Sequence, residues 1–179
     1  QYECFFLIAD LHVLTTDFEH PQRIQAHILE LLADWIASGI DPEHAHLVLQ
    51  SAIPAHAQLA TLLGMLVSVA RLSRVPTYKE QQQQLSLKPS LGLLAYPVLQ
   101  AADILAYRGE FVPVGKDQEA HVNMTRDLAQ LARFVAAYGR TVGALARSGT
   151  RVGEVDLRYR NGFAARVPGF REKPAKRAL

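Results

Sequence analysis

A stripe of polar side chains on one otherwise apolar helix is the part of the sequence best suited to bind a small molecule. We expect residues 97–107 to form this helix, with Pro97 in its first turn. Spacings of three and four residues place polar groups on one helical face, and a side chain just before the first turn can point over it. The stripe consists of Tyr96, Gln100, Asp103 and Tyr107.

Asp103 is the most demanding member of this stripe, because an ionised carboxylate among Ala, Ile and Leu loses hydration unless it is paired. One interpretation is a buried hydrogen-bond network, for example with Asp103 accepting from Tyr107. The other is a pocket for a small ligand with an N–H or ammonium group, since an ionised carboxylate only accepts hydrogen bonds. A desolvated acceptor also discriminates against ligands that lack the donor.

A glycine junction follows this helix. Residues 111–114 predict a third strand, and Asp117 is suited to cap a helix over residues 117–138. Gly115 would let a ligand approach the backbone, and the free N–H groups at the helix start could accept a nucleotide. Every α/β protein contains such junctions, so an ordinary structural turn is the alternative.

The elements that must position these groups alternate between strands and helices. Gly39 should end the first helix, and Gly64 should weaken the second. This order predicts an α/β fold with a parallel sheet and right-handed crossovers. The remaining expected elements are strands over residues 4–9 and 47–49 and helices over residues 21–38 and 56–74.

Charge divides the chain of 179 residues, of which 49% are hydrophobic. Residues 1–139 carry 9 Lys and Arg against 14 Asp and Glu, a net charge of −5, whereas residues 140–179 carry 10 against 3, a net charge of +7. We therefore expect a domain over 1–139 and a basic tail over 140–179 that could touch RNA phosphates or be solvated. No signal peptide or membrane-spanning stretch is visible, which favours a cytoplasmic protein.

The other titratable side chains suggest no metal site and no nucleophilic triad. Cys4 lies on an apolar strand and is expected to be a buried core thiol. His12 follows the first strand, where it could pack over an aromatic ligand or cap a turn. Solvated or capping roles are expected for four further histidines, namely His44, His46, His56 and His121.

Several motifs lie in order between about residue 5 and residue 133. The most specific are Gly92-Leu-Leu-x-Tyr-Pro-Val-Leu-Gln-Ala-Ala-Asp-Ile-Leu105 and, closely after it, Val112-Pro-Val-Gly-x-Asp-Gln118. Shorter stretches are Phe5-Phe-Leu-Ile-Ala-Asp-Leu-His12, Gly39-Ile-Asp-Pro42, Leu49-Gln-Ser-x-Ile-Pro-Ala-His56 and Thr125-Arg-Asp127. Together they resemble the tryptophanyl-tRNA synthetases, which are class I aminoacyl-tRNA synthetases. The resemblance implies a Rossmann-like parallel sheet flanked by helices.

The resemblance also implies a role for each polar group. Asp103 would accept the indole N–H of L-tryptophan. The α-amino group would be held by Tyr96, Gln100 and Gln118, and the indole would be lined by His12, Ile104, Val112 and Val114. ATP, with magnesium as its counter-ion and no metal bound by the protein, would lie against Gly115, Lys116 and Asp117, and Lys79 would reach its phosphates.

By the same resemblance, the protein would activate tryptophan as an adenylate, transfer it to the tRNA for tryptophan, and form a homodimer through residues 56–74. The family's first strand and its His-x-Gly-His/Asn loop would precede residue 1. The later Lys-Met-Ser-Lys-Ser loop is matched only by the lysine spacing of Lys173-Pro-Ala-Lys-Arg177. A truncated tryptophan-binding paralogue or an inactive remnant is therefore the alternative to an active ligase.

Overall fold

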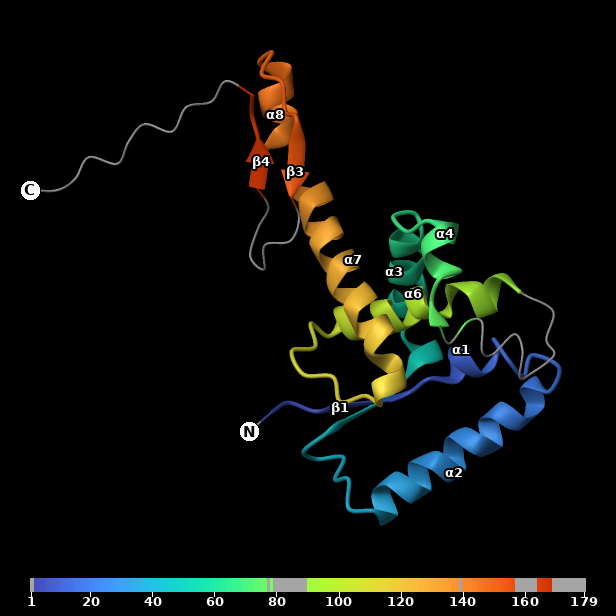
Figure 1. Ribbon diagram of the computed structural model, residues 1–179. Helices are drawn as coiled ribbons and strands as arrows, with labels where there is room; N and C mark the ends of the chain where they lie inside the picture. The colour runs from blue at the N-terminus through green and yellow to red at the C-terminus, as the bar shows by residue number, and fades with distance from the viewer. Residues whose placement is uncertain (1, 77, 79–89, 139, 157–163, 169–179) are drawn as a thin grey trace, which may run out of the picture. The chain divides into compact units, whose positions relative to one another are not determined.

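The computed structural model describes residues 2–76, 78, 90–138, 140–156 and 164–168 (Figure 1). Its chain forms two compact units, Gln1–Leu128 and Ala129–Leu179. A domain boundary after residue 139 stays a prediction. Lys79 and the segment 173–177 lie outside the described residues.

A two-stranded parallel sheet lies at the centre of the first unit. Strand β1 (Phe5–Ile8) pairs with β2 (His46–Leu49), with Phe5 opposite His46 and Ile8 opposite Leu49. Both strands are short apolar runs, as predicted for a parallel sheet that is covered on its faces. The connection between them contains α1 (Asp10–Val13), a 3₁₀ turn at Pro21–Arg23, and α2 (Ile24–Ala37).

Helices lie on both sides of these strands. Figure 1 shows α2 on one side and the helices α3, α4 and α6 gathered on the other. Trp35 of α2 packs against Phe6 of β1, with ring centroids 5.8 Å apart. The other layer comprises α3 (Ala55–Gly64), α4 (Val69–Leu72) and α6 (Leu91–Ala106). The buried core of this layer consists of Leu63, Leu72, Val98, Ala101, Ala102, Met124 and Leu128.

The helix breaks follow the predicted glycines. The helix over residues 21–38 ends before Gly39, whose φ of +95° is a left-handed conformation that favours glycine. The segment 56–74 divides after Gly64 into α3 and α4. Both predictions are confirmed.

The prediction that Pro97 opens its helix is wrong. Helix α6 begins at Leu91, and the hydroxyl of Ser90 caps it by accepting from the N–H of Leu93 at 3.0 Å. Pro97 lies inside the helix and is almost completely buried. A proline there removes only the hydrogen bond to the carbonyl four residues earlier, and the apolar face of the preceding residues packs into the core. The polar stripe keeps its spacing in the longer helix.

The third strand predicted over residues 111–114 does not form within the described ranges. A strand requires a hydrogen-bonded neighbour, and the described sheet of the first unit contains β1 and β2 alone. Residues 2–7 and 111–113 instead line the same cavity, where the rings of Tyr2 and Phe111 lie 5.2 Å apart between centroids.

Asp117 is not a helix cap. It lies in a 3₁₀ turn, Lys116–Gln118, and its carboxylate accepts from the side-chain amide of Gln118 at 2.6 Å. Helix α7 (Glu119–Tyr138) follows this turn. Because this turn comes first, α7 begins two residues after Asp117, and the Asp117 carboxylate is hydrogen-bonded within the turn.

The second unit contains elements that the sequence did not predict. Helix α8 (Val142–Arg147) is followed by β3 (Glu154–Asp156) and β4 (Ala164–Arg166), which pair antiparallel with Val155 opposite Ala165. Strands of three residues are too short to show a reliable hydrophobic period. No helix in the described part of the chain is both long and apolar enough to span a membrane.

Candidate functional site

The carboxyl ends of the two parallel strands are tied together by side chains. The carboxylate of Asp10, just after β1, accepts from the N–H of Ser51 at 3.0 Å. The amide oxygen of Gln50, just after β2, accepts from the N–H of Leu11 at 3.1 Å. This second bond fixes the orientation of the Gln50 amide, because its oxygen faces Leu11 and its NH₂ group must face the other way.

The Asp103 carboxylate receives that NH₂ group and two histidines. Gln50 Nε2 lies 2.8 Å from Oδ1 and 3.0 Å from Oδ2 of Asp103. His56 Nδ1 lies 2.7 Å from Oδ1, and His12 Nε2 lies 2.9 Å from Oδ2. Each carboxylate oxygen thus accepts two bonds, which fills the acceptor positions of the group. The buried charge is therefore fully hydrogen-bonded, as its 7% exposure requires.

One interpretation of the stripe was a network in which Asp103 accepts from Tyr107, and in the structure these two residues are joined through His56. The hydroxyl of Tyr107 lies 2.8 Å from His56 Nε2. His56 Nδ1 donates to Asp103, so in the neutral ring Nε2 accepts from the Tyr107 hydroxyl. Burial raises the pKa of Tyr107, and the charge of Asp103 raises it further. A network therefore does exist, with partners other than the one predicted.

The expectation of a solvated or capping His56 is wrong, since its ring is completely buried. Gln50 was not singled out at all. A signal for both was present in the sequence, because Gln50 directly follows a strand and parallel strands end at one edge. His56 lies in the first turn of α3, which packs against α6, the helix that carries Asp103.

A cavity of about 1000 Å³ opens beside this network. His12 contributes to its wall and has 22% of its side chain exposed, whereas Gln50 and His56 lie behind the wall. The structure places seven of the predicted site residues around the cavity and leaves Val114, which is 42% exposed, out of it. Those seven are His12, Tyr96, Gln100, Asp103, Ile104, Val112 and Gln118.

A second polar cluster lies at Tyr96. His121 Nδ1 lies 2.6 Å from the amide oxygen of Gln118, and His121 Nε2 lies 3.2 Å from the hydroxyl of Tyr96. Gln100 Nε2 reaches the same Gln118 oxygen at 3.4 Å. The three residues predicted to bind an α-amino group are therefore close together.

His121 is completely buried, so its predicted solvated or capping role is wrong. Burial lowers the pKa of its imidazole; Asp117 raises that pKa and His12 lowers it further. The neutral ring is consistent with its contacts, because the Gln118 oxygen can only accept and Nε2 is then left to accept from Tyr96.

The residues predicted to contact ATP lie at the glycine junction. Gly115, Lys116 and Asp117 are exposed and adjoin Gln118, which lines the cavity. Gly115 precedes the 3₁₀ turn. A Cβ at position 115 would meet the carboxylate of Asp117, so a larger residue there would displace this exposed side chain.

The structure also bears on the predictions for Cys4 and for the histidines His44 and His46. Cys4 is exposed, so the prediction of a buried thiol is wrong; β1 begins one residue later. The exposed His44 and His46 pair with Asp41 at 2.7 Å and with Glu3 at 2.9 Å. The backbone N–H of Glu43 and then His44 lower the pKa of Asp41. No group of side chains that could hold a metal ion occurs in the ranges the structure describes.

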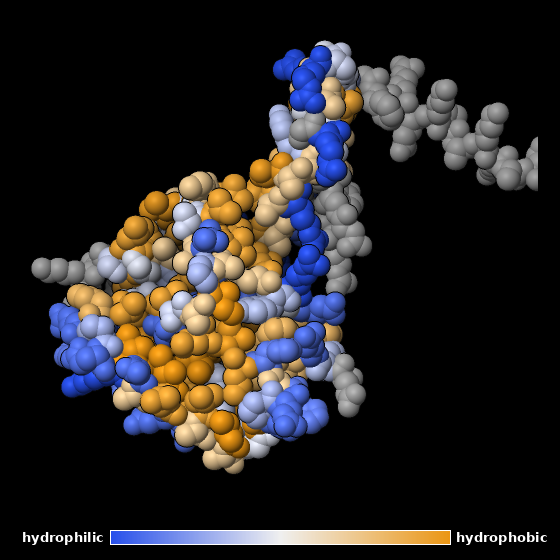
Figure 2. Space-filling model, turned by 180° about the vertical axis from the view of Figure 1, so that it is seen from behind, coloured by the Kyte–Doolittle hydropathy of each residue, from blue (hydrophilic) through white to orange (hydrophobic). Residues whose placement is uncertain are grey.

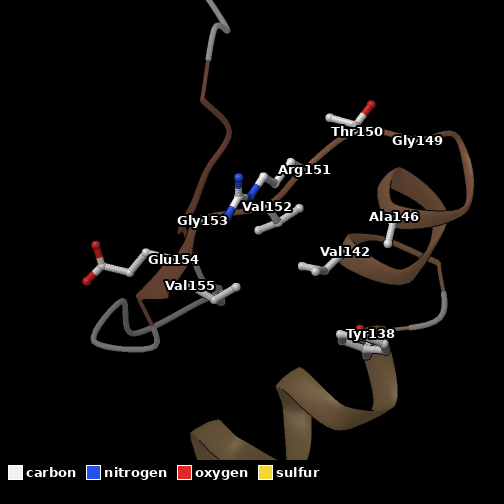
Figure 3. Close-up of a pocket in the computed structure, with 10 residues that line it drawn as sticks. All are labelled: Tyr138, Val142, Ala146, Gly149, Thr150, Arg151, Val152, Gly153, Glu154 and Val155. Carbon is white, nitrogen blue, oxygen red and sulfur yellow. The ribbon is translucent and has the colours of Figure 1, made fainter.

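The second unit has an open cavity of about 450 Å³ (Figure 3). Tyr138, Val142, Val152 and Val155 supply apolar lining from α7, α8 and β3 and the segment before it, while Arg151 and Glu154 add charge. Among these lining residues, all of which the structure describes, none is a buried charged group comparable to Asp103, so we assign the cavity no function.

Comparisons with known proteins agree with the arrangement of the first unit. Residues 1–145 match the family model for class I tRNA synthetases (W and Y). The chain is 51% identical over 145 residues to a tryptophan–tRNA ligase of Ralstonia nicotianae, covering 80% of this chain and 36% of that protein. It is 48% identical over 135 residues to the tryptophan–tRNA ligase of Thermotoga maritima, covering 74% and 41%. The chain thus spans about two fifths of the length of the curated relatives it matches.

Solved structures lead to the same fold. Tryptophanyl-tRNA synthetase from Campylobacter jejuni, complexed with ADP and tryptophan, has a TM-score of 0.65 and 34% identity, over 70% of this chain and 38% of that one. The enzyme from Mycoplasma pneumoniae has a TM-score of 0.65 and 37% identity, over 70% and 37%. The predicted Rossmann-like α/β fold is confirmed.

Proposed function

Because the chain belongs to the class I tRNA synthetases for tryptophan and tyrosine, we propose that it is the catalytic core of a tryptophan–tRNA ligase. The observation that carries the proposal is the buried Asp103 carboxylate at the cavity wall, with Tyr96, Gln100 and Gln118 around the same cavity. A buried carboxylate accepts the N–H of an indole and discriminates against rings that lack a donor.

Tryptophan would enter with its indole N–H directed at Asp103. The acceptor positions of that carboxylate are filled, so the indole N–H would replace the His12 contact, which is the donor nearest to solvent. His12 could then pack over the ring. The apolar part of the indole would lie against Ile104, Val112 and Val114, of which the first two line the cavity.

The α-amino group would lie at the cluster of Tyr96, Gln100 and Gln118. An ammonium group only donates, and the hydroxyl oxygen of Tyr96 can accept from it while donating its own proton to His121. The amide oxygen of Gln100 is a further acceptor, and that of Gln118 would become one by giving up its 3.4 Å contact with Gln100 Nε2. His121 would then orient two of these three groups without contacting the substrate.

ATP would lie over Gly115, Lys116 and Asp117, with Lys79 on its phosphates and magnesium as its counter-ion. An oxygen of the tryptophan carboxylate attacks the α-phosphorus, the bond to the β-phosphate bridging oxygen breaks, and pyrophosphate leaves. A hydroxyl of the tRNA then attacks the carbonyl carbon of the adenylate, and AMP leaves. Positioning and charge stabilisation lower the barrier of such a step, and no covalent enzyme intermediate is needed.

Tryptophan-dependent exchange between ATP and pyrophosphate tests this function. We expect exchange in the complete polypeptide with L-tryptophan and much less with L-tyrosine. If neither L-tryptophan nor L-tyrosine supports exchange, the result contradicts ligase activity. Calorimetric titration with L-tryptophan then separates the alternatives: tryptophan binding without coupling to ATP indicates a tryptophan-binding paralogue, and absence of binding indicates an inactive remnant.

A homodimer formed through residues 56–74 is part of this proposal, as is a cytoplasmic location. Apolar side chains gather over much of one face of the first unit (Figure 2). In α3, α4 and the segment between them, Leu62, Met65 and Val69 are 60%, 75% and 66% exposed. We expect Met65→Glu to convert a dimer to a monomer in analytical ultracentrifugation, while Leu29→Glu on α2, at a residue 61% exposed, leaves the dimer intact. A monomeric wild-type protein contradicts the dimer.

A further inference from the structure

We infer that His56 is a positioning residue that sets the selectivity of Asp103 for a ligand with a ring N–H. The inference rests on the proposed tryptophan site. His56 has no place in the wall of the cavity, so it acts on a ligand only through the carboxylate that it holds. It was expected to be solvated or to have a capping role, and the proposed function assigns it no role.

The contacts of Asp103 divide into one exchangeable donor and two fixed ones. His12 contacts Oδ2 from the cavity side and keeps 22% of its side chain exposed. Gln50 and His56 are completely buried and approach from behind the cavity wall. A ligand donor therefore replaces His12 at Oδ2, while the other two donors remain in place.

His56 keeps the carboxylate plane from turning during that exchange. Gln50 Nε2 lies between both oxygens, so alone it would tolerate rotation of the carboxylate. His56 Nδ1 makes the shortest of the four contacts, 2.7 Å, and it contacts Oδ1 alone. This contact leaves Oδ2 directed at the cavity when His12 departs.

Tyr107 in turn fixes the ring of His56. Its hydroxyl holds Nε2 at 2.8 Å, and the two rings lie 5.4 Å apart between centroids. Asp103 lies in the last turn of α6, and Tyr107 lies one turn later, directly after the helix. His56 is therefore held at both nitrogens by the same end of one helix. Both partners of the imidazole are thus carried by one rigid element.

Two substitutions at position 56 separate the contact with Asp103 from the contact with Tyr107. An asparagine amide nitrogen lies roughly where Nδ1 of histidine lies, so His56→Asn keeps a donor for Asp103. A glutamine amide nitrogen lies roughly where Nε2 lies, so His56→Gln keeps a partner for Tyr107 and removes the donor to Asp103. Both variants retain a polar group in the buried position.

The measurement is the ratio of dissociation constants for 3-benzothienyl-L-alanine, in which sulfur replaces the ring N–H, and L-tryptophan. We expect a ratio of about tenfold or more in the wild-type protein, since the missing bond is to a charged group. His56→Asn should keep the ratio within about threefold, and His56→Gln should lower it by about tenfold.

Equal weakening of both ligands in His56→Gln, with the ratio unchanged, overturns the inference and leaves a purely structural histidine. Failure of the wild-type protein to bind either ligand overturns the proposed function, and the inference falls with it. If circular dichroism shows that His56→Gln does not fold, Tyr107→Phe takes its place. That variant should lower the ratio by about threefold, and an unchanged ratio contradicts the inference.

Discussion

The hydroxyl oxygen of Tyr96 lies 3.2 Å from Nε2 of His121, and the imidazole ring is completely buried. The opposite nitrogen of that ring contacts the amide oxygen of Gln118 at 2.6 Å. One neutral imidazole therefore joins α6 to the start of α7 and orients two groups at the cavity wall. Protonation of the ring would place a second donor opposite the Tyr96 hydroxyl.

This arrangement predicts that His121 destabilises the protein at acidic pH. Its pKa is lowered in the folded state from an ordinary value of 6.5, so the unfolded chain takes up a proton that the folded chain does not. The loss of folding stability caused by this pKa shift is absent well above pH 6.5 and grows as the pH falls below that value. Urea denaturation at about pH 7.5 and about pH 5.5 should show a smaller loss in His121→Gln than in the wild-type protein.

His44 provides the matched control for that experiment, because it is exposed and pairs with Asp41 at the surface. His44→Gln should keep the loss of stability that the wild-type protein shows between the two pH values. An equal loss in His121→Gln and the wild-type protein would mean that His121 does not titrate differently in the two states.

Asp103→Asn should weaken tryptophan binding by about 1–3 kcal/mol, because a charge-assisted hydrogen bond is lost. The substituted amide would also place an NH₂ group among three donors, from Gln50, His56 and His12. Calorimetric titration measures the effect, with the exposed Asp41→Asn as control. A dissociation constant equal to that of the wild-type protein would make Asp103 a structural residue only.

Ser90→Ala should lower the free energy of unfolding by about 1 kcal/mol. The hydroxyl of Ser90 accepts from an N–H in the first turn of α6, at 3.0 Å from the nitrogen of Leu93. Ser38→Ala is the control, because the Ser38 hydroxyl contacts an exposed carbonyl at a helix C-terminus. Urea denaturation of both variants measures the difference, and equal effects would contradict a capping role.

Two exposed glycines should respond to alanine in opposite directions. Gly64 ends α3 in a helical conformation, and a methyl group there would meet no atom within 4 Å, so Gly64→Ala should stabilise the protein by about 0.5–1 kcal/mol. Gly39 has equal space but a φ of +95°, so Gly39→Ala should destabilise it by about 1–2 kcal/mol. Thermal denaturation of the two variants compares them, and shifts of the same sign would refute the conformational argument.

Local pattern was sufficient for the parts of this fold that depend on neighbours in sequence. The strand at Phe5–Ile8, the helix ending before Gly39 and the division after Gly64 all follow from hydrophobic period and glycine. Residues 111–114 have the composition of a strand, but a strand also needs a hydrogen-bonded partner, and the described sheet of the first unit joins only β1 and β2. Composition alone cannot supply that partner.

The site shows the same division. Spacing placed Gln100 and Asp103 on one face, because they share a helix. His56 and His121 carry no such signal, because their contacts are with groups 47 and 25 residues away along the chain, Asp103 and Tyr96. Only the packing of α3 against α6 and the course of α7 bring these side chains together. Capping a helix and binding a buried carboxylate require the same kind of residue, so type alone does not separate them.

The exposed position of His12 on Asp103 has a consequence for rates as well as for selectivity. A ligand that donates to this carboxylate exchanges one hydrogen bond for another, so it gains less affinity than it would from a carboxylate with a free acceptor position. His12 stays attached to the chain nearby, at a high effective concentration, and competes for Oδ2 throughout the lifetime of the complex. The imidazole would therefore shorten the residence time of a bound ligand. Such a site combines selectivity for a ligand with a donor and rapid release of that ligand.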